Sequence, residues 1–396
     1  MGSGSKMTDF KNITILCDVI DNFGDIGVAY RLAKSLTELD SALKLTLVCS
    51  NLESFASMNP EVDPAKKIQE IKYKNSLWTI LDWNLDEKEV TLLKEKKLPV
   101  SDFSFPVILE CFQCGRPDWI ENIIFSPENT LLHYIFNIEY LTAEQYAEDF
   151  HLLKSYTRSS FVKKRFFMPG FTSKTAGLIV DEGFLNSIKQ MPAKTSDQFT
   201  VTMFSYERDF TQIFEALNRF QKKHQKKNPA FSVNVLGAAG KSLPFVKEAW
   251  EKTGRQVKLT ELPFLKQDEW DKVLCSSSLN FIRGEESLAR AALTGIPFVW
   301  HAYLQDEDYQ LVKVDALLDR LLPHLLPELR DSVKILWDDY NTPGKELDYR
   351  FLDKLFDSVY DGTISKGFKD FADALLANGS LAKNLLDYLH TIEKNP

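Results

Sequence analysis

The chain alternates between two hydrophobic patterns. Short apolar runs occupy residues 13–20, 43–49, 105–111 and 131–138, whereas apolar residues in 28–39 recur every three to four positions. Continuous runs are typical of strands buried on both faces, and the longer period is typical of a helix with one buried side. The alternation predicts a parallel sheet covered by helices. Residues 66–98 are charged, contain Trp and fit neither pattern, so no element is predicted there.

The second half repeats this alternation more regularly. A helical pattern follows each strand-like run except the last, which is typical of a Rossmann-like domain. The runs are residues 199–204, 231–236, 257–262, 279–283 and 297–300. Residues 347–392 are helical in pattern.

The length of the chain favours more than one domain. Its 396 residues exceed the roughly 250–300 at which a single core stops growing. A polar connector at residues 190–198, containing Pro192, separates the two halves. We predict Rossmann-like domains at residues 7–190 and 191–345, and helices at 346–396 that pack across both. Residues 1–6 resemble a cloning remnant and carry no fold information.

Composition excludes several classes of partner. The formal net charge of −8 argues against nucleic acid, because phosphate binding depends on lysine and arginine. No apolar run reaches the roughly 18 residues that cross a bilayer, and no signal-peptide pattern opens the chain, so a cytoplasmic protein without a membrane partner is expected. Cys111 and Cys114 form one CxxC, but no second pair or His-rich segment completes four zinc ligands, so no metal is predicted.

The first strand-to-helix loop contains two aspartates, Asp21 and Asp25. Its glycines would allow a tight turn into a helix, but their spacing is not GxGxxG, and two carboxylates would repel a pyrophosphate. As a pair they could hold a guanidinium and remove a proton from it. In the alternative interpretation, Asp25 caps the helix and Asp21 forms an Asx turn.

A second loop, after the run at 279–283, combines Arg283, Gly284 and Ser287 at the start of a predicted helix. The helix N-terminus, the guanidinium and the hydroxyl together could bind a diphosphate. The neighbouring Glu285 and Glu286 are also explained by the general preference for acidic residues in a first helical turn.

Aromatic residues stand near two other strand ends of this half. Phe204 with Tyr206, and Phe264 with Trp270, could sandwich a nucleobase whose edge Gln267 would bind. The alternative is that these rings belong to the core, as most aromatic residues do.

Two long motifs resemble one known family. Residues 19–27, VIDNFGDIG, are similar to the amino-terminal motif of the bacterial arginine rhamnosyltransferases that modify translation elongation factor P. Residues 281–287, FIRGEES, followed by 295–301, GIPFVWH, resemble a second motif of the same family. The resemblance spans the chain after Met7. Trp270 and Glu286 depart from the family pattern, in which a Phe and an Asp occupy these positions.

The resemblance implies a GT-B glycosyltransferase: an amino-terminal acceptor-binding domain and a carboxyl-terminal nucleotide-sugar-binding domain, both Rossmann-like, face a central cleft. It implies inverting transfer of L-rhamnose from dTDP-β-L-rhamnose to an arginine of elongation factor P, with no cofactor or metal. The implied catalytic residues are Asp21, Asp25 and Glu285, with Asp25 as general base. The implied donor pocket is Phe204, Tyr206, Phe264, Gln267, Trp270, Arg283, Gly284, Glu286 and Ser287, and Asn22, Phe23, Gly24 and Gly27 support the first loop.

Three alternatives stay open at this point. A transferase of the same fold could use another nucleotide sugar or acceptor, and a non-catalytic nucleotide-sugar-binding protein would need the donor pocket alone. An NAD-dependent oxidoreductase is disfavoured because no GxGxxG follows a strand.

Overall fold

The computed structural model describes residues 10–20, 23–95, 105–192 and 197–394 and divides into two compact units. Unit 1 contains the chain up to Leu141, Gln145–Glu182 and the residues from Asn378 on; unit 2 contains Thr142–Glu144 and Gly183–Ala377. These units begin and end at other residues than the predicted domains, 7–190, 191–345 and 346–396, which stay a prediction.

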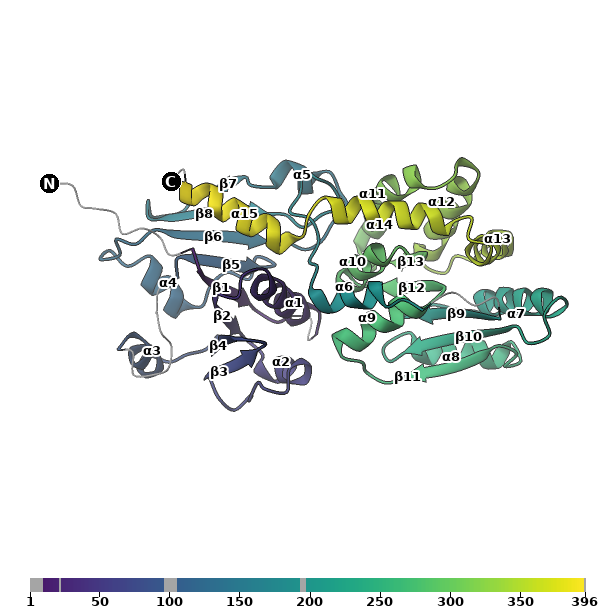
Figure 1. The fold of residues 1–396 in the computed structure, drawn as a ribbon, viewed down its shortest axis with the longest axis horizontal. Coiled ribbons are helices and arrows are strands. Elements are labelled where there is room, and N and C mark those ends of the chain that lie inside the picture. The colour runs from purple at the N-terminus through teal and green to yellow at the C-terminus, as the bar shows by residue number, and fades with distance from the viewer. Residues whose placement is uncertain (1–9, 21–22, 96–104, 193–196, 395–396) are drawn as a thin grey trace. The chain divides into compact units, whose positions relative to one another are not determined.

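Unit 1 is built on an eight-stranded sheet with the order β3-β4-β2-β1-β5-β6-β8-β7 (Figure 1). The six inner strands are parallel, and an antiparallel strand closes each edge. The strands are β1 (Asn12–Cys17), β2 (Lys44–Cys49), β3 (Ile68–Tyr73), β4 (Ser76–Asp82), β5 (Val107–Cys111), β6 (His133–Ile138), β7 (Lys154–Ser155) and β8 (Val162–Phe167).

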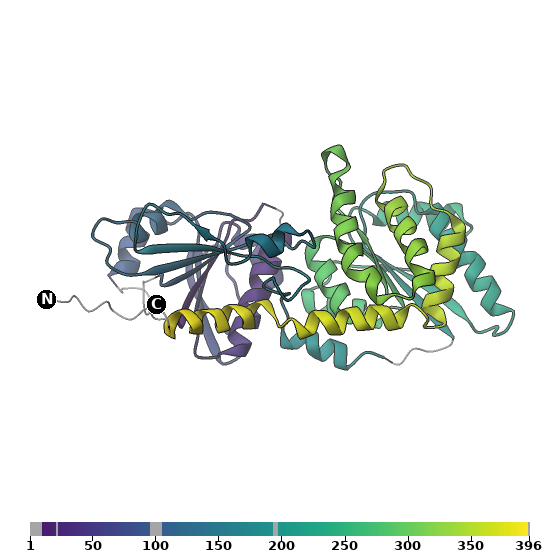
Figure 2. The same ribbon diagram turned by 90° about the horizontal axis from the view of Figure 1, so that it is seen from above.

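Helices cover both faces of this sheet. One core joins the strands to α1, α2 and α15, and a second core on the other face joins them to α3 and α4 (Figure 2). The helices are α1 (Gly24–Leu39), α2 (Leu52–Met58), α3 (Glu87–Lys94), α4 (Asp118–Ile124), α5 (Tyr146–Phe150) and α15 (Leu381–Lys394).

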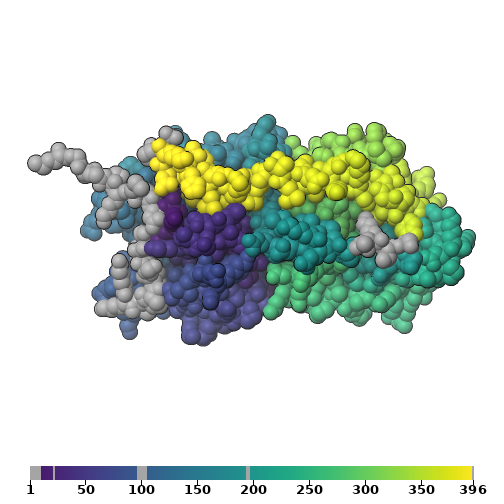
Figure 3. All heavy atoms as spheres, in the orientation of Figure 1, coloured from purple at the N-terminus to yellow at the C-terminus, as the bar shows by residue number. Residues whose placement is uncertain are grey.

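Helix α15 brings the end of the chain back to unit 1. Its buried residues, such as Leu385, join the core formed by α1, and it lies at the surface beside α1 (Figure 3). Ser380 pairs with Leu178 in an isolated β-bridge, and the Asn384 side chain donates to the Ala176 carbonyl over 3.0 Å. The predicted helical character of the tail is confirmed.

Unit 2 contains a five-stranded, fully parallel sheet with the order β11-β10-β9-β12-β13. The strands are β9 (Gln198–Met203), β10 (Ser232–Ala238), β11 (Lys258–Leu262), β12 (Leu279–Arg283) and β13 (Phe298–His301). The helices are α6 (Glu182–Lys189), α7 (Thr211–Gln225), α8 (Leu243–Lys252), α9 (Gln267–Ser276), α10 (Glu285–Thr294), α11 (Tyr309–Leu321), α12 (Pro327–Asn341), α13 (Tyr349–Tyr360) and α14 (Ser365–Ala377), with 3-10 turns η1 (Asp306–Asp308) and η2 (Leu322–His324). All five predicted strands are confirmed within a residue or two.

The sequence predicts no element in residues 66–98, and the described part of this segment, residues 66–95, contains the hairpin β3–β4 and helix α3. The hairpin turns at Lys74, whose φ of 52° is left-handed. Trp78 of β4 is fully buried and its indole N–H donates to the Thr37 hydroxyl over 3.0 Å. Helix α3 begins with a capping box in which Asp86 and Glu89 each accept the other's backbone N–H.

The order of parallel strands reverses once in each sheet, between β1 and β5 in unit 1 and between β9 and β12 in unit 2. At such a reversal the loops that leave neighbouring strands diverge, and ligands of open α/β sheets bind there, beyond the carboxyl ends of the strands. The loops after β1 and β5, and after β9 and β12, are therefore where a site is expected.

Candidate active site

The reversal in unit 2 places two predicted segments side by side. Strands β9 and β12 pair in parallel, and the Phe204 N–H donates to the Phe281 carbonyl over 2.9 Å. Phe204 and Tyr206 follow the end of β9, and Arg283 is the last residue of β12. Residues 77 or more positions apart in the chain thus meet at one edge of the sheet.

The Arg283 guanidinium lies against two aromatic rings. Its central carbon is 4.7 Å from the ring centre of Phe204 and 4.8 Å from that of Tyr206. Its Nε is buried and has no hydrogen-bond partner among the described residues. The rings hold the guanidinium by cation–π contact while leaving this donor unused, as expected for a group that binds an anionic ligand.

Gly284 connects Arg283 to helix α10 in a conformation that suits glycine. Its φ of 73° and ψ of 165° are accessible almost only without a side chain. Helix α10 begins at the next residue, Glu285, and Gly284 offers no side-chain cap. The first N–H groups of a helix have no partner within the helix and favour an anion, so this end of α10 suits a phosphate.

Two side chains in the first turn of α10 are fixed by neighbours. The Glu286 carboxylate accepts from Nε of Arg290, which is buried, over 3.2 Å. The Ser287 hydroxyl accepts from the Trp270 indole N–H over 3.1 Å. Trp270 also meets Phe204 edge-on, with ring centres 5.1 Å apart. The aromatic pair and the helix start therefore form one connected cluster.

The other two predicted donor residues lie in the segment before Trp270. Gln267 is the first residue of α9, and Phe264 lies in the loop between β11 and α9 with 60% of its surface exposed. Phe264 is consequently accessible to a ligand, unlike a core phenylalanine.

No role was assigned from the sequence to three residues next to this cluster, which are Gly240, Ser205 and His301. Gly240, whose φ is 143°, borders the cluster, because a Cβ there would be in ordinary contact with the Phe204 ring at 3.6 Å and with an Arg283 amino group at 3.9 Å. The buried His301 imidazole shares a 2.7 Å hydrogen bond with the Ser205 hydroxyl, and its ring meets Tyr206 edge-on. Burial, with the nearby Arg208 and Arg283 charges, lowers the pKa of His301 to about 3. The glycine after a strand was the one available signal.

In unit 1, Asp25 lies in the first turn of α1 and is 3% exposed. One carboxylate oxygen accepts from the Ile20 N–H over 2.9 Å, and the other accepts from the Tyr140 hydroxyl over 3.4 Å. The N-cap residue of α1 is Phe23, whose side chain makes no capping hydrogen bond. Asp25 therefore binds the loop before the helix and a residue that follows β6.

The structure describes only some of the remaining residues of the first loop. Asp21 and Asn22 lie outside the described residues. Gly24 is the first residue of α1, and the Gly27 N–H donates to the Phe23 carbonyl over 3.1 Å. Asp25 belongs to unit 1 and Glu285 to unit 2, so a shared carboxylate site of Asp21, Asp25 and Glu285 stays a prediction.

No group of three or more His, Cys, Asp or Glu is arranged to hold a metal ion in the part of the chain that the structure describes. Cys111 is buried at the end of β5, and the Cys114 thiol donates to the Leu16 carbonyl over 3.5 Å. Within the same residues, no helix is both long and apolar enough to cross a membrane.

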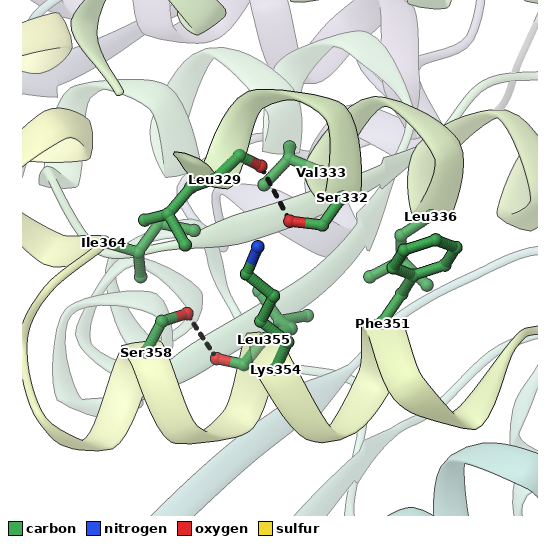
Figure 4. Close-up of a pocket in the computed structure, with 9 residues that line it drawn as sticks. All are labelled: Leu329, Ser332, Val333, Leu336, Phe351, Lys354, Leu355, Ser358 and Ile364. Atoms are coloured by element: carbon green, nitrogen blue, oxygen red, sulfur yellow. Dashed lines mark hydrogen bonds between the residues drawn. The ribbon is translucent and has the colours of Figure 1, made fainter. Parts of the chain in front are cut away.

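A small pocket between α12 and α13 has about 10 Å³ of internal space (Figure 4). It is lined mostly by apolar side chains, and its hydroxyl groups, Ser332 and Ser358, donate to carbonyls of their own helices over 2.8 and 2.9 Å. A space of this size holds about one water, so it is a packing gap and not a substrate site.

Two doubly wound α/β units, the second with an arginine and a helix start at its strand reversal, have the architecture of a GT-B glycosyltransferase. The family model described as "Elongation-Factor P (EF-P) rhamnosyltransferase EarP" matches residues 13–390. The chain belongs to this family and is a protein-arginine rhamnosyltransferase.

Individual relatives agree with this assignment. The protein-arginine rhamnosyltransferase of Shewanella oneidensis is 30% identical over 348 residues, covering 80% of this chain and 82% of its own. That of Pseudomonas aeruginosa is 28% identical over 351 residues, covering 83% and 87%. A solved structure described as "Structural basis for EarP-mediated arginine glycosylation of translation elongation factor EF-P" has a TM-score of 0.54 and 18% identity, and covers 96% of this chain and 99% of its own. This last likeness concerns the fold.

Proposed function

We propose that the protein transfers L-rhamnose from dTDP-β-L-rhamnose to a side-chain nitrogen of one arginine of elongation factor P, inverting the anomeric centre and using no metal or other cofactor. The observation that carries the proposal is the Arg283 guanidinium, held between Phe204 and Tyr206 at the start of α10. This arrangement supplies positive charge for a diphosphate from the protein itself.

The donor binds in unit 2. Arg283, the N–H groups after Gly284 and the Ser287 hydroxyl hold the diphosphate and stabilise the charge that grows on it as the sugar leaves. Phe264 and Trp270 pack against the thymine base, and Gln267 binds its edge. Phe204, Tyr206 and Glu286 complete the pocket, with Glu286 oriented by Arg290.

The acceptor requires activation, because an arginine guanidinium has a pKa above about 12 and delocalised lone pairs. Asp21, Asp25 and Glu285 orient it, and Asn22, Phe23, Gly24 and Gly27 support the first loop. Asp25 takes a proton as the nitrogen attacks the anomeric carbon. The new C–N bond forms on the face opposite the breaking C–O bond, dTDP departs, and the configuration inverts. Because the acceptor is a translation factor, the reaction is placed in the cytoplasm.

The test is to incubate the purified protein with dTDP-β-L-rhamnose and elongation factor P, with and without EDTA, and to weigh the factor. We expect a gain of one rhamnosyl residue, located on one arginine, that EDTA does not reduce. Parallel reactions with dTDP-glucose and UDP-glucose should give no gain. Donor binding without any mass change would leave a nucleotide-sugar-binding protein, and activity that EDTA removes and Mg²⁺ restores would contradict the metal-free mechanism.

A further inference from the structure

Tyr140 contacts the Asp25 carboxylate from a distant part of the chain. Its hydroxyl donates to one oxygen over 3.4 Å, while the Ile20 N–H donates to the other over 2.9 Å. Tyr140 follows the end of β6 and stands 115 residues from Asp25. The backbone N–H and the tyrosine hydroxyl therefore contact different oxygens of the carboxylate, and together they restrain its rotation.

The Tyr140 ring is itself supported. It stacks on Phe112, with ring centres 4.2 Å apart and an interplanar angle of 17°. Phe112 follows β5, the strand at the reversal of unit 1, so the pair lies at the edge where a ligand is expected. Tyr140 is nevertheless 42% exposed, which leaves part of its ring accessible from solvent.

The backbone beneath the stack is strained and firmly held. Phe112 and Gln113 have φ values of 59° and 53°, a left-handed conformation that is rare for bulky residues. The Phe112 N–H donates to the Ile138 carbonyl over 2.7 Å, and the Gln113 N–H donates to the Asn137 side chain over 3.1 Å. Such strain persists only where surrounding contacts impose it, and here the contacts fix the ring on which Tyr140 rests.

We propose that Tyr140, supported by Phe112, is a positioning residue that orients the Asp25 carboxylate toward the acceptor arginine. Proton transfer requires the carboxylate oxygen to meet the guanidinium N–H within hydrogen-bond distance, so a carboxylate free to rotate loses productive geometry. A hydroxyl on a stacked ring restrains this rotation without adding a charge that would compete with the guanidinium. This inference rests on the proposed function.

The test compares Tyr140→Phe, which removes the hydroxyl and keeps the stack, with the wild type. We expect kcat to fall about threefold to tenfold, because a hydrogen bond of 3.4 Å is long and contributes less than a short one to a charged group, while KM for dTDP-rhamnose stays constant. Phe112→Leu should lower kcat in the same way, because it keeps the hydroxyl but loosens the ring. Tyr156→Phe is the matched control in unit 1, since Tyr156 is fully exposed, and it should leave both constants unchanged.

The outcomes separate the inference from the proposed function. If the wild type transfers rhamnose and Tyr140→Phe has the same kcat, the inference is wrong and the function stands. If kcat is unchanged and only the donor KM rises, Tyr140 acts on the fold rather than on Asp25. A wild type that leaves elongation factor P unmodified would overturn the proposed function and the inference with it.

Discussion

The Trp270 indole donates its N–H to the Ser287 hydroxyl over 3.1 Å and so connects α9 to the first turn of α10. The same ring meets Phe204 edge-on, so one side chain contacts both the aromatic cluster and the helix start. A tryptophan can serve in both ways because it combines a large ring with a polar edge.

Removing this connection should weaken donor binding in two steps. Trp270→Phe keeps a ring but loses the hydrogen bond, and we expect it to cost about 0.5–1.5 kcal/mol of dTDP binding free energy. Trp270→Ala also loses the stacking, which raises the expected cost to about 1–3 kcal/mol. Calorimetric titration with dTDP measures both. Trp250→Phe in α8, whose indole N–H donates to the Val257 carbonyl, is the control. If the wild type and all three variants bound dTDP with equal affinity, Trp270 would contribute only to packing.

Arg283→Lys tests whether the planar guanidinium is needed beyond its charge. A lysine keeps the positive charge but has no planar group to place against the Phe204 and Tyr206 rings. We expect the dissociation constant for dTDP to rise at least about tenfold, equivalent to about 1.4 kcal/mol. Arg255→Lys, at an exposed ion pair with Glu251 in the same unit, should leave it unchanged. A normal affinity in Arg283→Lys would show that charge alone suffices.

Asp25→Asn separates the acceptor chemistry from donor binding. The amide preserves the shape of the carboxylate but cannot accept the guanidinium proton. We expect transfer to fall below detection, while the dissociation constant for dTDP, which binds in unit 2, stays within experimental error of the wild type. Intact-mass analysis and titration give the two values. Substantial turnover would remove Asp25 from the role of base.

Much of the fold could be predicted because most central strands consist of apolar runs. Such runs identified β1, β2, β5 and β6 and the strands of unit 2, whereas β8 was not predicted, because Lys163, Lys164 and Arg165 interrupt it. The hairpin β3–β4 could not be found this way, because polar residues such as Glu70, Lys72 and Thr79 interrupt its apolar pattern and no glycine marks its turn at Lys74. Its register is set by pairing with β2, which a local pattern does not contain.

The same distinction applies to the candidate site: contacts between neighbouring strand ends could be predicted, and contacts between distant loops could not. Phe204 and Arg283 could be placed near each other because both end parallel strands, and such ends share one edge of a sheet. The contact of Tyr140 with Asp25 depends on the order in which β1, β5 and β6 are arranged, which no local pattern reveals. Gly240 likewise borders Phe204 only in the folded protein, and no local pattern places the two near each other.

Breaking the buried ion pair of Arg31 and Asp181 should destabilise unit 1. Their side chains are 0% and 1% exposed, and they meet at 3.2 Å between α1 and the segment before α6. Asp181→Asn leaves a buried guanidinium without its charge partner, which should cost about 3–5 kcal/mol of unfolding free energy. Urea denaturation measures this. Replacing both residues, as Arg31→Met with Asp181→Leu, should recover most of the loss.

The control for this pair is Asp387→Asn on α15, which breaks an exposed pair with Lys383. Exposed pairs contribute only about 0–1 kcal/mol, so its effect should be small. If Asp181→Asn and Asp387→Asn were equally mild, the buried pair would not be a source of stability.

The buried His301 should make stability depend on pH in the mildly acidic range. Burial and the charges of Arg208 and Arg283 lower its pKa to about 3, whereas the pKa of a histidine in an unfolded chain is about 6.5. Between these pH values, His301 binds a proton in the unfolded chain but not in the folded protein. The free energy of unfolding therefore falls as the pH drops from about 6.5 toward 3, and the contribution of His301 is complete above about 6.5. At pH 5 the loss should reach about 2 kcal/mol at most.

Comparison of variants isolates this contribution from that of the carboxylates. His301→Asn retains a polar atom near the Ser205 hydroxyl but takes up no proton, so its stability should decline less between pH 7.5 and 5 than that of the wild type. His390→Asn, on the exposed side of α15, should decline as steeply as the wild type. Urea denaturation at several pH values, followed by tryptophan fluorescence, gives the three curves. If His301→Asn and the wild type lost the same free energy over this range, another group would have to take up the proton, because an imidazole that stays neutral in the fold and titrates when unfolded must contribute to the slope.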